Sequence, residues 1–284
     1  MVDIMSLETL LYHYTTPDGL IGIVESNTLW ATNALYLNDS RELAEGMGMG
    51  REHLRAMLRA VEDPARIERI EWLLNQVHDF GEAGRTKPVF VCSLTTQHDQ
   101  LSQWRAYCMG GGFAIGFPLD QLRACTESQR FDLHECNYVR AEQEALVSEI
   151  VDAVVRPWVY TSQLPVMDDD RRFKVSMTFA LELLRIAPRL KDDSFLEERE
   201  WRIISQPDRP YEAENRLFRS RNGLVIPYTT VSLPDSTDFW GKVHIVVGPS
   251  PHPSESKSSV YELVRRYRGV AIAIENSRAS YREW

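Results

Sequence analysis

Apolar residues recur along the chain with two spacings, and each spacing predicts a different kind of element. Positions three or four residues apart, as at Leu54, Met57 and Val61, are typical of amphipathic helices. Asp63-Pro64 interrupts the longest helical stretch, because an N-cap residue followed by proline starts a new helix. Helices are predicted over residues 16–26, 41–80, 100–107, 119–125, 141–155, 168–186 and 254–267.

Short apolar runs bounded by glycine, proline or polar residues predict strands. They cover residues 10–15, 28–35, 88–94, 113–117, 134–138, 200–205, 223–228, 243–247 and 270–274. The regular strand–helix alternation of a doubly wound fold is absent, and no glycine-rich phosphate loop follows a strand. The pattern predicts one α+β domain over residues 1–284, with a mixed or antiparallel sheet and helical insertions at about 41–84 and 141–188 that decorate one core.

Composition and charge restrict the partners and the cellular compartment that we expect for this domain. The formal net charge of −9 disfavours broad adhesion to duplex DNA. Two local basic groups are candidate contacts for nucleic acid: Arg216, Arg219 and Arg221, and also Arg265, Arg266 and Arg268. No apolar run is long enough to cross a membrane, and the first residues do not resemble a secretory signal. The four cysteines form no CxxC pair, which favours free thiols. We therefore expect a cytoplasmic protein without a membrane partner.

His13 is the first candidate for chemistry. It lies in a predicted strand, so its side chain should point away from those of Tyr12 and Tyr14. A neutral imidazole near a strand end can form a hydrogen bond with a ribose hydroxyl. The alternative is a histidine whose hydrogen bonds are satisfied in the core.

Hydroxyl and aromatic residues gather in the middle of the chain. The strand that contains Ser93 is followed by a helix with Trp104 and Tyr107 three residues apart, on one face. Such a pair can stack on a nicotinamide ring or belong to the core. Earlier, Asn38 and Asp39 are either helix-start residues or site residues, with Glu42 in the capping-box position.

Two carboxylates, those of Glu198 and Glu200, lie at the start of the predicted strand at 200–205. Glu198 and Glu200 share one face if the strand begins there, so one pKa should rise unless Arg202 or Lys191 offsets the repulsion. The alternative is a solvated charged loop. No cluster has the spacing of a metal site.

Taken in order, these residues resemble a family of mostly bacterial proteins known as domain of unknown function 2971. The resemblance rests on His13-Tyr14-Thr15, Leu29-Trp30, Asn38-Asp39, Ser93, Trp104, Tyr107, Gly116-Phe117 and the segment Glu198-Arg199-Glu200-Trp201-Arg202. That order is similar in turn to the ADP-ribosyltransferase superfamily. The resemblance implies an ADP-ribosyltransferase-like sheet and NAD as the substrate.

The resemblance also implies residue roles. His13 would hold a ribose of NAD, Ser93 or else Tyr107 would support the nicotinamide side, and Glu200 would complete a catalytic triad with Glu198 beside it. The residues expected to bind NAD are His13, Tyr14, Thr15, Asn38, Trp104, Tyr107, Glu198 and Arg202.

The leading hypothesis is an NAD-dependent ADP-ribosyltransferase. A toxin and a phage-defence effector are the biological roles considered, with nucleic acid or protein as acceptor and an antitoxin or other regulatory protein as partner. One rival is a metal-dependent nuclease that uses Asp39, Glu42, Glu198 and Glu200. The other rival is an inactive module that binds a nucleotide or a partner.

Overall fold

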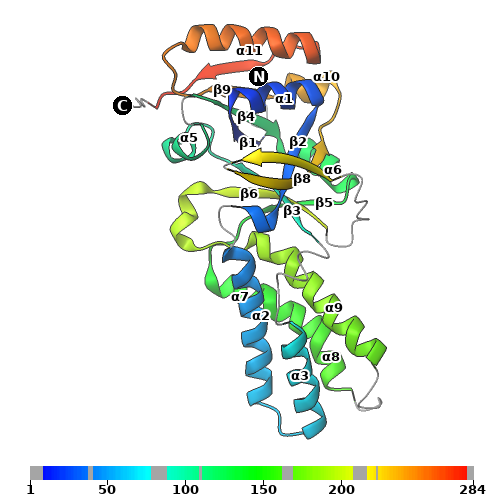
Figure 1. Cartoon of the computed structure of the whole chain (residues 1–284). Helices are drawn as coiled ribbons and strands as arrows, with labels where there is room; N and C mark the ends of the chain where they lie inside the picture. Colours follow the sequence, from blue (N-terminus) through cyan, green and yellow to red (C-terminus); the bar gives the residue numbers. More distant parts are fainter. Residues whose placement is uncertain are drawn as a thin grey trace, which may run out of the picture.

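A computed structural model describes residues 9–37, 41–77, 88–108, 111–161, 169–206, 216–221 and 223–279, with only the backbone at 41–43. Its strands form one mixed, open sheet (Figure 1). The strands are β1 (Leu10–Thr15), β2 (Thr28–Asn33), β3 (Phe90–Thr95), β4 (Phe113–Pro118), β5 (Phe131–Glu135), β6 (Glu200–Ser205), β7 (Leu217–Arg221), β8 (Leu224–Ser232), β9 (His244–Val247) and β10 (Ala273–Asn276).

The sheet runs in the order β10-β9-β4-β1-β3-β2-β8-β7, with β6 also beside β3 and β5 beside β6. Only β10 and β9 run parallel among these pairs, whereas the other pairs are antiparallel. The predicted α+β class with a mixed sheet is thus confirmed.

Strand β3 is the branch point of the sheet. One of its edges pairs with β6 from Val91 to Thr95. The opposite edge is shared, because β2 pairs with it at Phe90 and Val91 while β1 meets it only at Thr95. The middle of that edge, around Ser93, has no partner strand among the described residues. The sheet therefore parts between β1 and β3.

One face of the sheet is covered by helices from the beginning, the middle and the last third of the described chain. Helix α1 follows β1 directly, because Thr16 caps it by accepting a hydrogen bond from the Gly19 N–H and Pro17 fits its first turn. Side chains such as Leu20, Phe239 and Val260 pack against the strands. The covering helices are α1 (Pro17–Ser26), α6 (Leu119–Ser128), α10 (Thr237–Gly241) and α11 (Pro253–Arg268).

The two predicted helical insertions pack against each other and form a bundle with its own hydrophobic core (Figure 1). The sequence had suggested that both insertions decorate a single core, whereas the bundle has a core of its own. Leu54, Ile70, Val151 and Phe179 meet there from four different segments. The helices of the bundle are α2 (Arg41–Arg59), α3 (Pro64–Gln76), α7 (Arg140–Ile150), the π-helical η2 (Val151–Val155), α8 (Arg156–Val159) and α9 (Asp169–Ile186).

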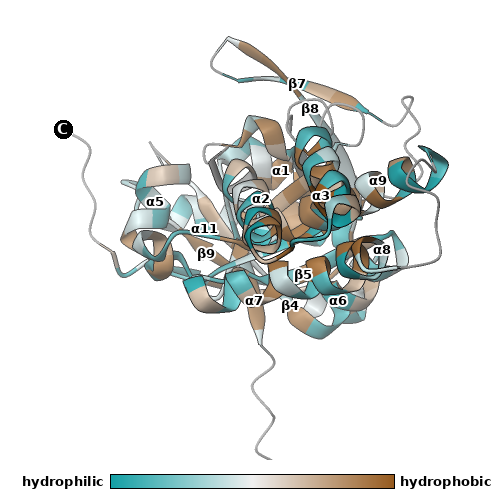
Figure 2. Cartoon of the chain, turned by 90° about the horizontal axis from the view of Figure 1, so that it is seen from below, coloured by the Kyte–Doolittle hydropathy of each residue, from teal (hydrophilic) through white to brown (hydrophobic). Residues whose placement is uncertain are grey.

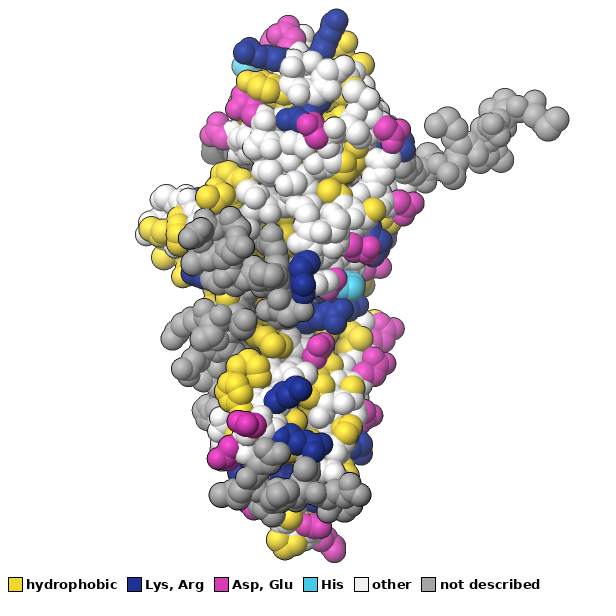
Figure 3. Space-filling view, turned by 90° about the vertical axis from the view of Figure 1, so that its right-hand side faces the viewer, with side chains coloured by type: hydrophobic (Ala, Val, Ile, Leu, Met, Phe, Trp, Pro, Cys, Tyr) yellow, Lys and Arg dark blue, Asp and Glu magenta, His cyan; other side chains and the backbone are white. Residues whose placement is uncertain are grey.

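Short helices connect these parts. They are η1 (Ala34–Tyr36), α5 (Leu101–Tyr107), η3 (Ala187–Arg189) and η4 (Asp193–Glu198). A small cluster that includes Val91, Leu184 and Ala187 joins the bundle to the sheet. Acidic and basic side chains are both scattered over the face seen in Figure 3. No helix in the described ranges has the length and apolar character needed to cross a membrane.

Some strand predictions differ from the structure. The strand predicted at 134–138 begins earlier and ends at Glu135, because Arg130 adopts a left-handed conformation with φ of 61° just before it. The edge strand β7 was not predicted, since its side chains are exposed on both faces and show no alternation of burial. The last strand begins at Ala273 instead of residue 270.

Two glycines of α2 give a matched test of bundle packing. A Cβ added at Gly46 would lie 2.7 Å from the Cβ of Ala187, whereas one at Gly48 would meet nothing within 4 Å. We expect Gly46→Ala to lower the free energy of unfolding by about 1–3 kcal/mol through overpacking. Gly48→Ala should raise it by about 0.5–1 kcal/mol, because alanine favours a helix interior. Urea unfolding of both variants checks this, and equal shifts would contradict the close approach of α2 to η3.

Candidate functional site

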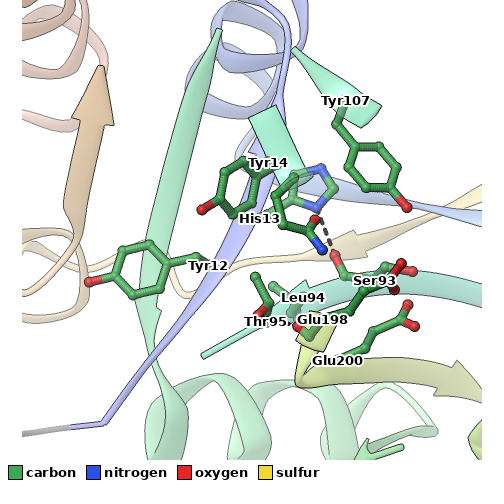
Figure 4. Close-up of a pocket in the computed structure, with 10 residues that line it drawn as sticks. Tyr12, His13, Tyr14, Ser93, Leu94, Thr95, Tyr107, Glu198 and Glu200 are labelled. Atoms are coloured by element: carbon green, nitrogen blue, oxygen red, sulfur yellow. Dashed lines mark hydrogen bonds between the residues drawn. The ribbon is translucent and has the colours of Figure 1, made fainter. Parts of the chain in front are cut away.

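A small hollow, partly open to solvent, lies where β1 and β3 part (Figure 4). Its cavity volume is about 50 Å³, below the roughly 300–1,000 Å³ that is typical of small-molecule pockets, so only part of a larger ligand fits within it. Its lining comes from β1, β3, α5 and the junction of η4 with β6. The lining residues are Tyr12, His13, Tyr14, Ser93, Leu94, Thr95, Gln103, Tyr107, Glu198 and Glu200.

His13 bridges the gap between the two strands. Its Nδ1 lies 2.9 Å from the carbonyl oxygen of Ser93, on the edge of β3 that lacks a partner strand. Burial lowers the pKa of His13, so the ring is neutral near pH 7. A neutral ring that donates from Nδ1 to a carbonyl leaves Nε2 as an acceptor. The imidazole therefore satisfies an open strand edge and keeps one lone pair for a ligand.

Tyr14 and Trp104 form the wall behind this pocket. The Tyr14 hydroxyl donates to the Gln97 carbonyl oxygen at 2.9 Å and accepts from the Gln100 N–H at 3.0 Å. Its ring lies 4.6 Å from that of Trp104, whose indole N–H donates to Asp99 at 2.7 Å. Trp104 is fully buried and does not line the pocket. It supports Tyr14 from the core.

Tyr107 and Trp104 both belong to α5, but only Tyr107 lines the pocket. Burial, followed by the charges of Glu200 and Glu198, raises the pKa of its hydroxyl, which therefore stays protonated near neutral pH. Figure 4 shows the Tyr107 ring on the opposite side of the hollow from Tyr14, with Ser93 and the two glutamates below. The hydroxyl is available as a donor to a ligand between them.

The two carboxylates converge on one lysine. Lys191 Nζ binds Glu198 Oε2 at 2.6 Å and also Glu200 Oε2. Arg202 grips Glu200 from the other side, with Nε 2.9 Å from Oε1 and Nη2 2.9 Å from Oε2. Two carboxylates and two cations thus make a compact cluster, and Glu200, Arg202 and Lys191 are all buried.

These cations decide the protonation of Glu200. Burial alone would raise its pKa, but Arg202 and Lys191 outweigh burial and lower the pKa to about 2. The expected repulsion between the carboxylates is therefore offset by the two cations considered from the sequence. Glu200 is ionised at every physiological pH, and both of its oxygens have cationic partners.

Glu198 lies at the end of η4, before the strand. The turn to β6 is made by Arg199, whose φ of 41° is left-handed and unusual for a residue with a side chain. The Glu198 carbonyl oxygen accepts from the Thr95 hydroxyl at 2.6 Å, which ties the turn to β3. Its carboxylate is 22% exposed, against 6% for that of Glu200. Glu198 therefore has the carboxylate that a ligand can reach.

The remaining predicted residues have other positions. Thr15 does not line the pocket, and its carbonyl oxygen lies 3.4 Å from Cys108 Sγ. Arg202 lies beneath the pocket and acts on Glu200. Asn38 and Asp39 fall outside the described residues, as does the side chain of Glu42.

Four lining residues were not predicted as site residues: Tyr12, Leu94, Thr95 and Gln103. Strand alternation alone could have predicted Tyr12 and Thr95, because each lies two residues from a predicted site residue and therefore on the same strand face. The cysteines are free, as expected. Within the described ranges no group of three or more His, Cys, Asp and Glu residues has the arrangement of a metal site.

One comparison with known proteins gave a match, and it covers a part of the chain that contributes to the pocket. Searches of curated proteins and of solved structures gave no match. Residues 103–203, which include Tyr107, Lys191, Glu198 and Glu200, match the model of a family described as "Protein of unknown function (DUF2971)". That match supports the similarity to this family suggested by the ordered residues of the sequence.

Proposed function

We propose that the chain binds NAD in the pocket between β1 and β3 and cleaves its nicotinamide–ribose bond, as an ADP-ribosyltransferase-like enzyme. The observation that carries the proposal is that His13, Ser93 and Glu198 line one pocket although they are far apart in sequence. The same three segments are those that the superfamily resemblance implies. The acceptor would be a nucleic acid or a protein, and a toxin or phage-defence role and a regulatory partner remain part of this proposal.

The residue types suit that reaction. When the bond between nicotinamide nitrogen and C1′ of ribose breaks, its electron pair leaves with neutral nicotinamide and positive charge develops on the ribose. A fixed carboxylate stabilises that charge, and Glu198 has the accessible one. An acceptor oxygen or nitrogen then bonds to C1′, and its proton passes to a carboxylate or to water.

The other lining residues would orient the substrate. Nε2 of the neutral His13 accepts a hydrogen bond from a ribose hydroxyl. The Tyr107 and Ser93 hydroxyls are available to the nicotinamide side. Glu200 differs from the role implied by the resemblance, since Arg202 and Lys191 hold both of its oxygens. In this proposal Glu200 positions Lys191, and Lys191 in turn fixes Glu198.

The nuclease alternative is less well supported at this pocket. Lys191 Nζ lies between the carboxylates of Glu198 and Glu200, the position that a bridging divalent cation would need. A metal there would have to displace a buried ammonium group.

The test is NAD binding and nicotinamide release by the wild-type protein. We expect calorimetric binding of NAD and release of nicotinamide that increases when cell lysate supplies an acceptor. Parallel reactions with Mg²⁺ or Mn²⁺ and labelled nucleic acid test the nuclease. If the wild-type protein neither binds NAD nor releases nicotinamide, the proposal is overturned. Binding of NAD without release of nicotinamide would favour an inactive nucleotide-binding module.

A further inference from the structure

A second cluster lies beside the pocket, on β2, β8 and β7. We call Trp30, Thr32, Tyr228, Arg219 and Arg221 the Trp30 platform. The rings of Trp30 and Tyr228 are 4.5 Å apart at their centroids and inclined by 34°. The guanidinium carbon of Arg219 lies 5.7 Å from the centroid of Trp30, and its Nη2 donates to Thr32 Oγ1 at 2.8 Å. The arginine is thus held against the aromatic pair.

The platform presents an open aromatic ring and available positive charge. Trp30 is 43% exposed, although tryptophan side chains are on average well buried. Nε of Arg219 is buried and finds no acceptor in the described part of the chain. Among the described residues neither Arg219 nor Arg221 has a carboxylate partner. In a chain with a net charge of −9, such a pair of arginines is suited to an anionic ligand.

The platform borders the pocket. Thr32 pairs with Val91, so both side chains share the sheet face that also carries Ser93, two residues farther along β3. Arg219 binds Thr32 on this same face, and after burial its charge contributes to the lowered pKa of His13. The hairpin of β7 and β8 stands out from the body in Figure 2, and Trp30 on the neighbouring strand β2 is exposed to solvent.

We propose that the Trp30 platform is a nucleotide subsite, in which a nucleobase stacks on Trp30 and a phosphate binds Arg219 and Arg221. Flat aromatic side chains accept any base by stacking, and an arginine fork matches phosphate oxygens. The claim that the platform binds part of the substrate rests on the proposed function. The claim that it binds a nucleotide does not. The nucleotide has two possible sources, the adenosine half of NAD and one unit of a single-stranded nucleic-acid acceptor.

The experiment measures binding by calorimetry for NAD, AMP and adenosine and by fluorescence anisotropy for a short labelled single-stranded oligonucleotide. Trp30→Leu should weaken nucleotide binding by about 10-fold or more, because one base loses its stacking partner. Trp30→Phe should retain most of it, since the ring remains. Tyr267→Leu is the control, because Tyr267 is also exposed, at 39%, and lies beside an arginine on the far helix α11.

A second pair of variants separates phosphate from base and serves if Trp30→Leu does not fold. Wild type should bind AMP more tightly than adenosine. Arg219→Ala should remove that preference, whereas Arg266→Ala on α11 should leave it unchanged. Losses confined to NAD and AMP would assign the subsite to the adenosine half of NAD, and losses that include the oligonucleotide would assign it to the acceptor.

The proposal is overturned if no nucleotide probe binds the wild-type protein, or if Trp30→Leu and Arg219→Ala both bind the probes as tightly as wild type does. Failure of the proposed function is distinct. It would appear as Trp30-dependent nucleotide binding without nicotinamide release, which leaves the subsite standing.

Discussion

Glu200→Gln should lower the free energy of unfolding by about 3–5 kcal/mol, which is the cost of removing one partner from a buried ion cluster. The substitution keeps the shape of the side chain but removes the carboxylate charge that Arg202 and Lys191 both bind in the interior. Both cations are buried, so water cannot replace the lost partner. The variant should therefore be strongly destabilised before any effect on catalysis can be read.

Urea unfolding followed by circular dichroism measures this effect. Glu197→Gln is the matched control, because Glu197 is the neighbouring carboxylate in η4 but is exposed and does not line the pocket. Its effect should stay within about 0.5 kcal/mol. A Glu200→Gln protein as stable as this control would show that the buried cluster adds little to stability.

Acid provides an independent reading of the same cluster. The pKa of Glu200 is about 2 in the folded chain, against an ordinary value of 4.5. A lowered folded pKa means that the stabilisation is fully present above pH 4.5 and is lost as the pH falls towards 2. The difference in unfolding free energy between wild type and Glu200→Gln should therefore shrink over that window. A difference that stays constant down to pH 2 would argue against the ionic origin of the effect.

Glu198→Gln should lower the rate of nicotinamide release by about 100- to 1,000-fold, a size typical of removing one group that stabilises the transition state. Glu198 lines the pocket and its carboxylate is partly exposed, so the substitution removes a charge that faces the substrate. Lys191 retains Glu200 as its partner, which keeps the buried cluster compensated. Activity should therefore be lost while the fold is preserved.

Nicotinamide release at saturating NAD, measured beside a thermal melt, checks both halves of this expectation. Glu197→Gln again serves as the control and should release nicotinamide at the wild-type rate. If Glu198→Gln remained active, the carboxylate acting on the substrate would have to be sought elsewhere, with Glu200 as the next candidate. A large fall in melting temperature would instead point to a structural role for Glu198.

Local signals in the sequence predicted the elements whose ends they mark. Thr16 and Pro17 start α1, and Asp63 caps α3 by accepting from two backbone N–H groups, as proposed from the sequence. The strands that contain His13 and Glu200 have the predicted bounds. The bundle was not predicted, because helical periodicity shows that a helix has an apolar face but not which other helix covers it.

The site was predicted in part, and the division has a physical basis. Residue types and their order indicated His13, Ser93, Tyr107 and the glutamates, and these residues do line one pocket. Trp104 was placed with Tyr107 by helical spacing, but the short helix turns it into the core behind Tyr14. The branching at β3 depends on pairings between distant segments, which no local pattern contains.

The chain order of the two cores has a consequence for synthesis on the ribosome. The last residue of the bundle core, Leu190, is made before the strand that begins at Glu200. One edge of each of β2, β3 and β4 pairs with β8, β6 and β9, and none of these three strands is made before Glu200. A growing chain therefore completes its helical bundle while the earlier strands still expose unpaired edges, which are the segments that chaperones protect. The pocket, whose lining includes Glu198 and Glu200, therefore forms only after the bundle segments have been made.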